Sequence, residues 1–155
     1  MLEYQVRTLS GQANKKEVRK MNKDIIEQWE ANKGKLEEYF KTTKQENYDD
    51  YKDIFEKIVE LILTNEKYDT KRITEIDDGD YQGMKIFIIP EDTYQPYIDN
   101  YLFTYVDYGS CSGCDTLQSI HEYENDLPTK EQVEEYMTLA LHIIQRMKRW
   151  GDFED

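Results

Sequence analysis

The stretch Tyr101-Leu-Phe-Thr-Tyr-Val-Asp-Tyr108 decides the fold, because nearly every position carries a bulky side chain. Aromatic and β-branched residues favour strands, and a strand that is bulky on both faces is typical of a sheet centre covered on both sides. Two similar runs precede it, Lys71 to Asp77 and Tyr81 to Pro90, and turn-forming residues separate all three. We therefore predict a three-stranded antiparallel meander, with Tyr101 to Tyr108 as a central, doubly covered strand.

Helical periodicity precedes the strands. From Lys15 to about Thr43, apolar residues recur every three, four or seven positions. This spacing predicts one long helix or two collinear helices, with a break at Gly34 because glycine costs about 1 kcal/mol inside a helix. Asn47 can cap a second helix, whose apolar face extends from Tyr48 to Ile62. We expect this helix to end near Thr64.

Two capping-box patterns predict the helices that follow the strands. Asp115-Thr-Leu-Gln118 opens a short helix to about Glu122, and Thr129 with Gln132 opens the last helix. We expect that helix to end at Gly151, with three cations in its final turn, where they suit the helix dipole: Arg146, Lys148 and Arg149.

These patterns predict an α+β fold. N-terminal helices, a three-stranded antiparallel sheet and C-terminal helices packed on the sheet form one domain of residues 1–155, a usual domain length. The helical part covers residues 1–70, the α+β module covers 71–150, and we expect residues 151–155 to form a frayed tail.

The charge of the chain is uneven. The net charge is −13, and residues 75–126 hold twelve acidic residues but only one basic residue, Lys85. The negative electrostatic field of this segment repels nucleic acid and attracts basic protein surfaces. The alternative is that the acidic residues only keep the protein soluble. Carboxylates interleaved with tyrosines can imitate a nucleic-acid surface, so we predict a partner-binding acidic face made of Asp77, Asp78, Asp80, Tyr94, Tyr97 and Asp99.

No stretch approaches the roughly 18 apolar residues of a membrane span, and the first residues do not have the pattern of a signal peptide. We therefore expect no membrane association and a location in the cytosol. Cysteines are kept reduced there, so Cys111 and Cys114 point to metal binding, redox chemistry or packing rather than a structural disulfide.

The turn Tyr108-Gly-Ser-Cys-Ser-Gly-Cys-Asp115 is the strongest candidate ligand site. Its small residues permit a tight turn with converging backbone N–H groups, which suits an anion, and a thiol at a helix N-terminus has a lowered pKa. Small residues that pack a tight turn around buried thiols are the alternative. The candidate ligand-binding residues are Tyr81, Gln82, Tyr108, Ser110, Cys111, Ser112, Gly113, Cys114, Asp115, Thr116 and His142.

Other chemistry has less support in the sequence. A zinc ion would have one candidate ligand set: Cys111, Cys114, His121 and His142. Because the sequence has no second cysteine pair, we expect no cofactor. Thiol–disulfide exchange on a thioredoxin-like sheet is disfavoured because no strand is predicted after the Cys turn. Phosphate-binding loops, dinucleotide-binding glycine motifs and the hydrolase nucleophile elbow are all absent, so binding is favoured over catalysis.

Three segments resemble small uncharacterised proteins of tailed phages and prophages of low-GC Gram-positive bacteria. The segments are Asp78-Gly-Asp-Tyr-Gln-Gly83, Tyr108-Gly-Ser-Cys-Ser-Gly-Cys-Asp-Thr-Leu-Gln118 and Tyr136-Met-Thr-Leu-Ala-Leu-His142 running on to Gln145. The resemblance covers about residues 75–150, and Asp107 stands where an uncharged residue is expected. The resemblance implies a phage setting and a shared structural module, but it does not imply any catalysed reaction.

The resulting hypothesis is a phage-derived acidic protein that antagonises or redirects a host factor with a basic surface, such as a defence nuclease, without binding nucleic acid itself. The alternative is a module that binds or sequesters a phosphate-bearing small molecule, or a weak enzyme, with its site at the Cys turn. A third possibility is an assembly component in which the N-terminal helix pairs into a homo-oligomer.

Overall fold

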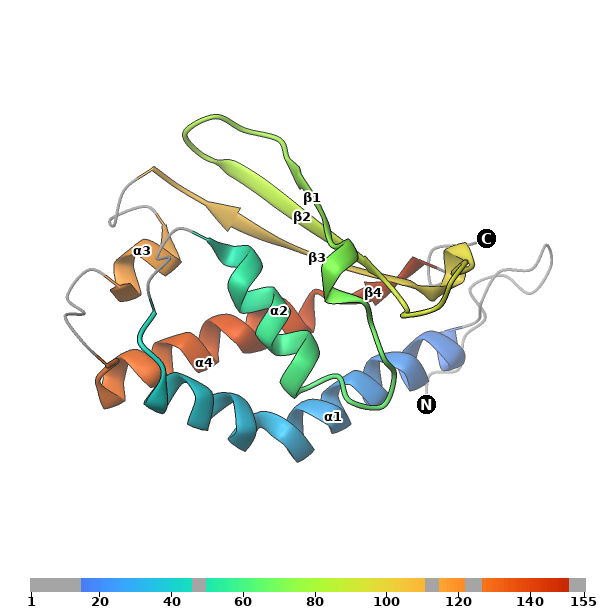
Figure 1. The fold of residues 1–155 in the computed structure, drawn as a ribbon, viewed down its shortest axis with the longest axis horizontal. Coiled ribbons are helices and arrows are strands. Elements are labelled where there is room, and N and C mark those ends of the chain that lie inside the picture. Colours follow the sequence, from blue (N-terminus) through green and yellow to red (C-terminus); the bar gives the residue numbers. More distant parts are fainter. Residues whose placement is uncertain (1–14, 46–49, 111–114, 122–126, 151–155) are drawn as a thin grey trace.

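A computed structural model describes residues 15–45, 50–110, 115–121 and 127–150, with the side chains of 15–22 and 121 outside the description. The sheet has four antiparallel strands in the order β1-β2-β3-β4 (Figure 1). The strands are β1 (Thr74–Asp77), β2 (Gly83–Pro90), β3 (Tyr101–Tyr108) and β4 (Lys148–Arg149). The predicted α+β class, the antiparallel meander and the central place of β3 are confirmed.

The helices are α1 (Lys15–Thr42), α2 (Tyr51–Leu61), α3 (Thr116–His121) and α4 (Lys130–Gln145), with two short 3-10 turns, η1 (Thr70–Arg72) and η2 (Ile98–Asn100). In Figure 1, α2 and the C-terminal end of α4 lie next to the sheet, and α1 packs on these two helices on the side away from the sheet. No helix within the described ranges is long and apolar enough to cross a membrane.

Stacked aromatic rings join the layers. The rings of Phe55 on α2 and Phe87 on β2 lie 5.3 Å apart, and those of Phe40 on α1 and Tyr136 on α4 lie 4.8 Å apart. Such pairs add about 0.5–1.5 kcal/mol to the free energy gained by burial. A buried hydrogen bond of 2.9 Å from the hydroxyl of Thr104 to the carbonyl of Ile143 fixes β3 on α4.

The prediction that both faces of β3 are covered is wrong for the part of the chain described. Side chains alternate along the strand, and those on the inner face, such as Leu102 and Val106, are buried against the helices. On the outer face Phe103 is only half-buried and Tyr105 is 37% exposed. The described long helices pack on one another and on the inner face, which leaves none for the outer face.

Three predicted boundaries also differ. Gly34 does not break α1, because it lies on the exposed side and the burial of Leu36 and Phe40 outweighs its cost. The cap of α2 is Asp50, whose carboxylate accepts the backbone N–H of Lys52 at 3.0 Å, and Asn47 lies outside the described residues.

The last helix ends at Gln145 rather than Gly151. After α4 the side chain of Met147 is buried, and the chain returns to the sheet as the unpredicted strand β4. In this strand Lys148 pairs with Phe103 and Arg149 pairs with Leu102. An ion pair between Arg149 and Glu66 holds this strand in place. The tail at 151–155 lies outside the described residues.

Candidate functional site

The candidate site lies between α3 and α4, and its geometry begins with Asp115. This residue is only 4% exposed, and one carboxylate oxygen accepts the hydroxyl of Tyr51 at 2.8 Å. The same hydroxyl accepts the backbone N–H of Leu117 at 3.0 Å. One buried tyrosine on α2 therefore fixes the first turn of α3.

Asp115 also ties the end of β3 to the start of α3. Its second oxygen accepts the backbone N–H of Gly109 at 2.9 Å, and its first oxygen accepts that of Gln118 at 3.1 Å. The predicted N-cap is thus confirmed, and the Gln118 side chain donates a further hydrogen bond to the carbonyl of Gly109 at 3.2 Å.

This network is an anchor and not an open ligand site. Burial raises the pKa of Tyr51 well above its ordinary value, and the hydrogen bond to Asp115 raises it further. The tyrosine therefore stays protonated and donates to the carboxylate at every physiological pH. Because protein donors already occupy both carboxylate oxygens of Asp115, we assign this residue to positioning the site.

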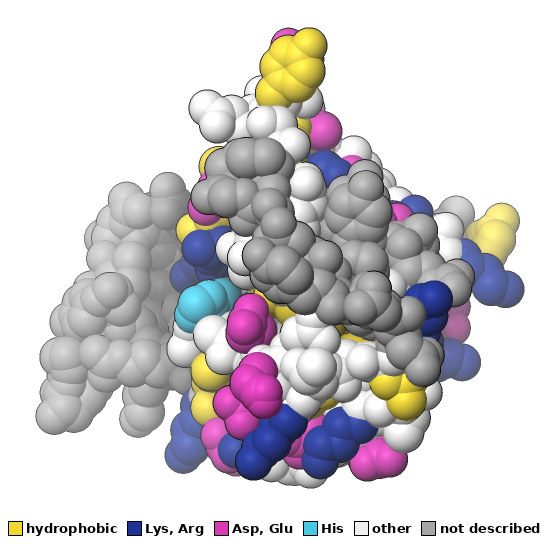
Figure 2. Space-filling model, turned by 90° about the vertical axis from the view of Figure 1, so that its left-hand side faces the viewer, with side chains coloured by type: hydrophobic (Ala, Val, Ile, Leu, Met, Phe, Trp, Pro, Cys, Tyr) yellow, Lys and Arg dark blue, Asp and Glu magenta, His cyan; other side chains and the backbone are white. Residues whose placement is uncertain are grey.

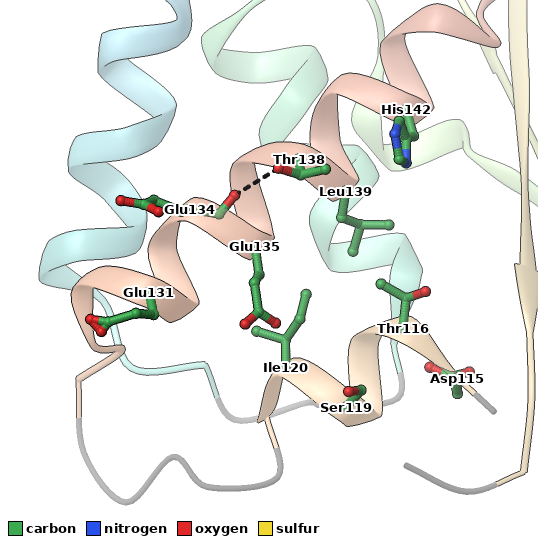
Figure 3. Close-up of a pocket in the computed structure, with 10 residues that line it drawn as sticks. All are labelled: Asp115, Thr116, Ser119, Ile120, Glu131, Glu134, Glu135, Thr138, Leu139 and His142. Atoms are coloured by element: carbon green, nitrogen blue, oxygen red, sulfur yellow. Dashed lines mark hydrogen bonds between the residues drawn. The ribbon is translucent and has the colours of Figure 1, made fainter. Parts of the chain in front are cut away.

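A groove of about 840 Å³ opens beside this anchor, between α3 and α4 (Figure 3). Its floor is apolar, formed by Ile120 at 3% exposure and Leu139 at 7%. In Figure 3, Glu135 and Leu139 point from α4 toward α3, while Thr116 points back from α3. The full lining is Asp115, Thr116, Ser119, Ile120, Glu131, Glu134, Glu135, Thr138, Leu139 and His142.

Carboxylates dominate the charge of the groove. Glu131, Glu134 and Glu135 are exposed, and none of them forms an ion pair with a described residue. Figure 2 views this end of the molecule and shows acidic side chains gathered beside a histidine. A hollow with an apolar floor and unpaired carboxylates suits a cationic side chain, whose aliphatic stem can lie on the floor while its charged head meets the rim.

The structure brings together only part of the predicted ligand site. Asp115, Thr116 and His142 line the groove, with His142 exposed. Gln82 and Tyr108 line a different, open hollow of about 460 Å³. Tyr81 is 81% exposed on the β1–β2 hairpin, and Ser110 is also exposed. The other predicted members lie outside the described residues: Cys111, Ser112, Gly113 and Cys114.

The predicted acidic face is divided between the two ends of the sheet. Asp77, Asp78 and Asp80 lie at the β1–β2 hairpin, whereas the group of Tyr94, Tyr97 and Asp99 lies in the β2–β3 connection (Figure 1). The eight residues of β2 separate the two groups by roughly 26 Å. One small partner surface therefore does not contact both groups at once.

A polar contact organises the hairpin end. The hydroxyl of Tyr108 donates to the carboxylate of Asp77 at 2.5 Å, which lowers the pKa of Asp77 and raises that of Tyr108 to about 12. The ring of Tyr108 also lies 5.2 Å from the ammonium of Lys85. This contact explains the position of Tyr108 without a ligand.

Metal binding finds no support among the residues that can be placed. No group of three or more His, Cys, Asp or Glu side chains there could hold a metal ion. Of the predicted zinc set only His142 has a described side chain, because Cys111, Cys114 and the side chain of His121 lie outside the description.

Sequence reasoning missed the three glutamates of the groove. Arg149, which we expected in the final turn of the last helix, belongs to β4 instead. The signal was present, because residues 131, 134, 135, 138 and 142 follow one another at helical spacing. No protein-family model, curated protein or solved structure matches the chain.

Proposed function

We propose that the protein works by binding, and that the groove between α3 and α4 receives a basic segment of a partner protein. The observation that supports this is the combination of an apolar floor, Ile120 and Leu139, with three glutamates that lack a cation among the described residues. A lysine or arginine side chain matches both features, because its stem is apolar and its head is cationic.

The wider charge of the chain supports the same conclusion. The net charge of −13 accelerates encounter with a basic surface, and the groove then supplies a specific contact. In the phage setting implied by the resemblance, the partner is a basic host factor, such as a defence nuclease, that the protein antagonises or redirects in the bacterial cytosol.

The charge of the groove favours this function over the binding of a phosphate-bearing ligand. Thr116 and His142 share the groove with Glu131, Glu134 and Glu135, and these carboxylates repel a phosphate at close range. A cationic ligand meets no such penalty.

The test is a pull-down from a Gram-positive bacterial lysate with three baits: the wild-type chain, the groove variant Glu134→Gln/Glu135→Gln and a matched control. The control is Glu27→Gln/Glu38→Gln, which removes the same charge from exposed positions of α1 outside the groove. We expect a basic protein captured by wild type and control at about 50 mM salt, lost with the groove variant and lost at about 500 mM salt.

Equal capture by the groove variant and the wild type would contradict the placement of the site. Capture that is unchanged between the two salt concentrations would contradict electrostatic recognition altogether. Circular dichroism of both variants establishes that the fold is kept.

A further inference from the structure

The β2–β3 connection, residues 91–100, exposes three large apolar side chains within five positions. Tyr94 is 92% exposed, Tyr97 is 80% exposed and Ile98 is 56% exposed. Single exposed apolar residues are normal on a protein surface, but a contiguous group marks an interaction site, and tyrosine is enriched among the residues that dominate binding energy. This connection is therefore a candidate interaction surface outside the groove.

Contacts from the preceding segment fix the backbone of the connection. The guanidinium of Arg72 donates to the carbonyl of Thr93 at 2.7 Å. The backbone N–H of Asp92 donates to the carbonyl of Lys67 at 2.8 Å, and the side chains of the same two residues form an ion pair at 3.4 Å. A partner therefore meets the tyrosines on an ordered loop, and binding costs little backbone freedom.

Elsewhere in the chain, a tyrosine ring and a carboxylate act together to bind a cation. In each of the three cation–ring contacts between described residues, the same cation also lies within 4.0 Å of a carboxylate. The ring attracts the cation through its quadrupole and the carboxylate attracts it through its charge. The three sets are Lys57 with Tyr39 and Glu60, Lys85 with Tyr108 and Glu75, and Arg146 with Tyr105 and Asp107.

The β2–β3 connection carries the same two groups, and no described cation contacts them. Tyr97-Ile-Asp99 repeats the residue order of Tyr105-Val-Asp107, the set that binds Arg146. Neither Tyr94 nor Tyr97 lies under a described cation, and Asp99 forms no ion pair with a described residue. These side chains are therefore complementary to an arginine of another protein, whose aliphatic stem finds an apolar neighbour in the exposed isoleucine between them.

We propose that the β2–β3 connection binds arginine side chains of a basic partner protein, which stack on the rings of Tyr94 and Tyr97 and pair with Asp99. The guanidinium is planar and stacks on aromatic rings, whereas the lysine ammonium is a compact, strongly hydrated charge. This surface is separate from the groove, because α3, which forms one wall of the groove, lies at the other end of the molecule (Figure 1).

An NMR titration of the full, isotope-labelled chain with two probe peptides tests the proposal. At about 50 mM salt, hexaarginine should shift the amide signals of residues 93–99. Hexalysine should bind at these residues at least about threefold more weakly. Signals from residues 116–121 and 131–142 report on the groove in the same spectra, so failure of this surface and failure of the proposed function are distinguishable.

Three variants separate the contributions of ring and charge. Tyr94→Leu/Tyr97→Leu removes both rings but keeps apolar side chains, and should weaken hexaarginine binding at residues 93–99 at least about fivefold. The matched control, Tyr81→Leu, changes a tyrosine that is 81% exposed on the β1–β2 hairpin and should leave this binding within about twofold. Asp99→Asn should weaken the binding of both peptides by about twofold or more.

Signals of residues 93–99 that do not move with hexaarginine would overturn the proposal. Equal affinities for the two peptides, or binding that is unchanged in Tyr94→Leu/Tyr97→Leu, would overturn it as well, because charge alone would then be responsible. Weakening by Tyr81→Leu that equals the effect of the double variant would contradict the placement of the surface.

Discussion

Replacing Tyr51 with phenylalanine removes a single hydroxyl that joins α2 to the first turn of α3. In the native protein this hydroxyl donates to Asp115 at 2.8 Å and accepts the N–H of Leu117 at 3.0 Å, and the tyrosine is 1% exposed. The substitution leaves a buried carboxylate with one donor fewer and a backbone N–H without this acceptor. A hydrogen bond to a charged group contributes about 1.5–3 kcal/mol, and an unsatisfied buried group costs about 1–3 kcal/mol.

We therefore expect Tyr51→Phe to lower the free energy of unfolding by about 2–4 kcal/mol. With a urea dependence of about 2 kcal/mol per molar, the unfolding midpoint should fall by about 1–2 M, as followed by circular dichroism. The control is Tyr94→Phe, which removes the same atom from a side chain that is 92% exposed and should change stability by less than about 0.5 kcal/mol. A loss below about 0.5 kcal/mol for Tyr51→Phe would refute the anchoring role of this network.

Two further predictions concern glycine and pH. Gly34→Ala should stabilise the protein by about 0.5–1 kcal/mol in urea unfolding, because an added Cβ meets no atom within 4 Å. Gly79→Ala should destabilise it, because the added Cβ would lie 2.1 Å from a backbone oxygen. The raised pKa of Tyr108 means that its contribution to stability is full below about pH 10 and is lost as the pH rises through about 12. Asp77→Asn should return this pKa toward its ordinary value in an NMR titration, and an unchanged value would rule out Asp77 as the cause.

Much of the fold was predictable because it depends on local patterns. The capping box of Thr129 and Gln132 is present as predicted, with both hydrogen bonds formed. The bulky run from Tyr101 to Tyr108 forms the predicted central strand. These features are decided within a few residues, and their spacing is visible in the sequence.

The errors share a different origin, namely contacts between residues far apart in the chain. Strand β4 depends on Arg149 reaching Glu66, 83 positions earlier, and nothing near Lys148 and Arg149 indicates a strand. The uncovered face of β3 likewise follows from where the helices pack and not from the composition of the strand, since bulky side chains look the same whether a helix or a second sheet covers them.

The candidate site was predicted in part for the same reason. Asp115, Thr116 and His142 were named as ligand-binding residues, and they meet at the groove because α3 packs on α4. The groove glutamates were assigned no role, because an exposed charge on a helix is usually only solvated. Their significance depends on the apolar floor beside them, which Ile120 of α3 and Leu139 of α4 form together.

Hydrogen–deuterium exchange of the chain with and without its captured partner tests the central claim most directly. If the groove receives the partner, amide protection should rise in Thr116–His121 and in the part of α4 from Glu131 to His142, which together line the groove. The exchange of β1 and β2 should stay unchanged. Protection confined to the sheet, with no change in α3 or α4, would contradict the claim that the carboxylate groove is the binding site.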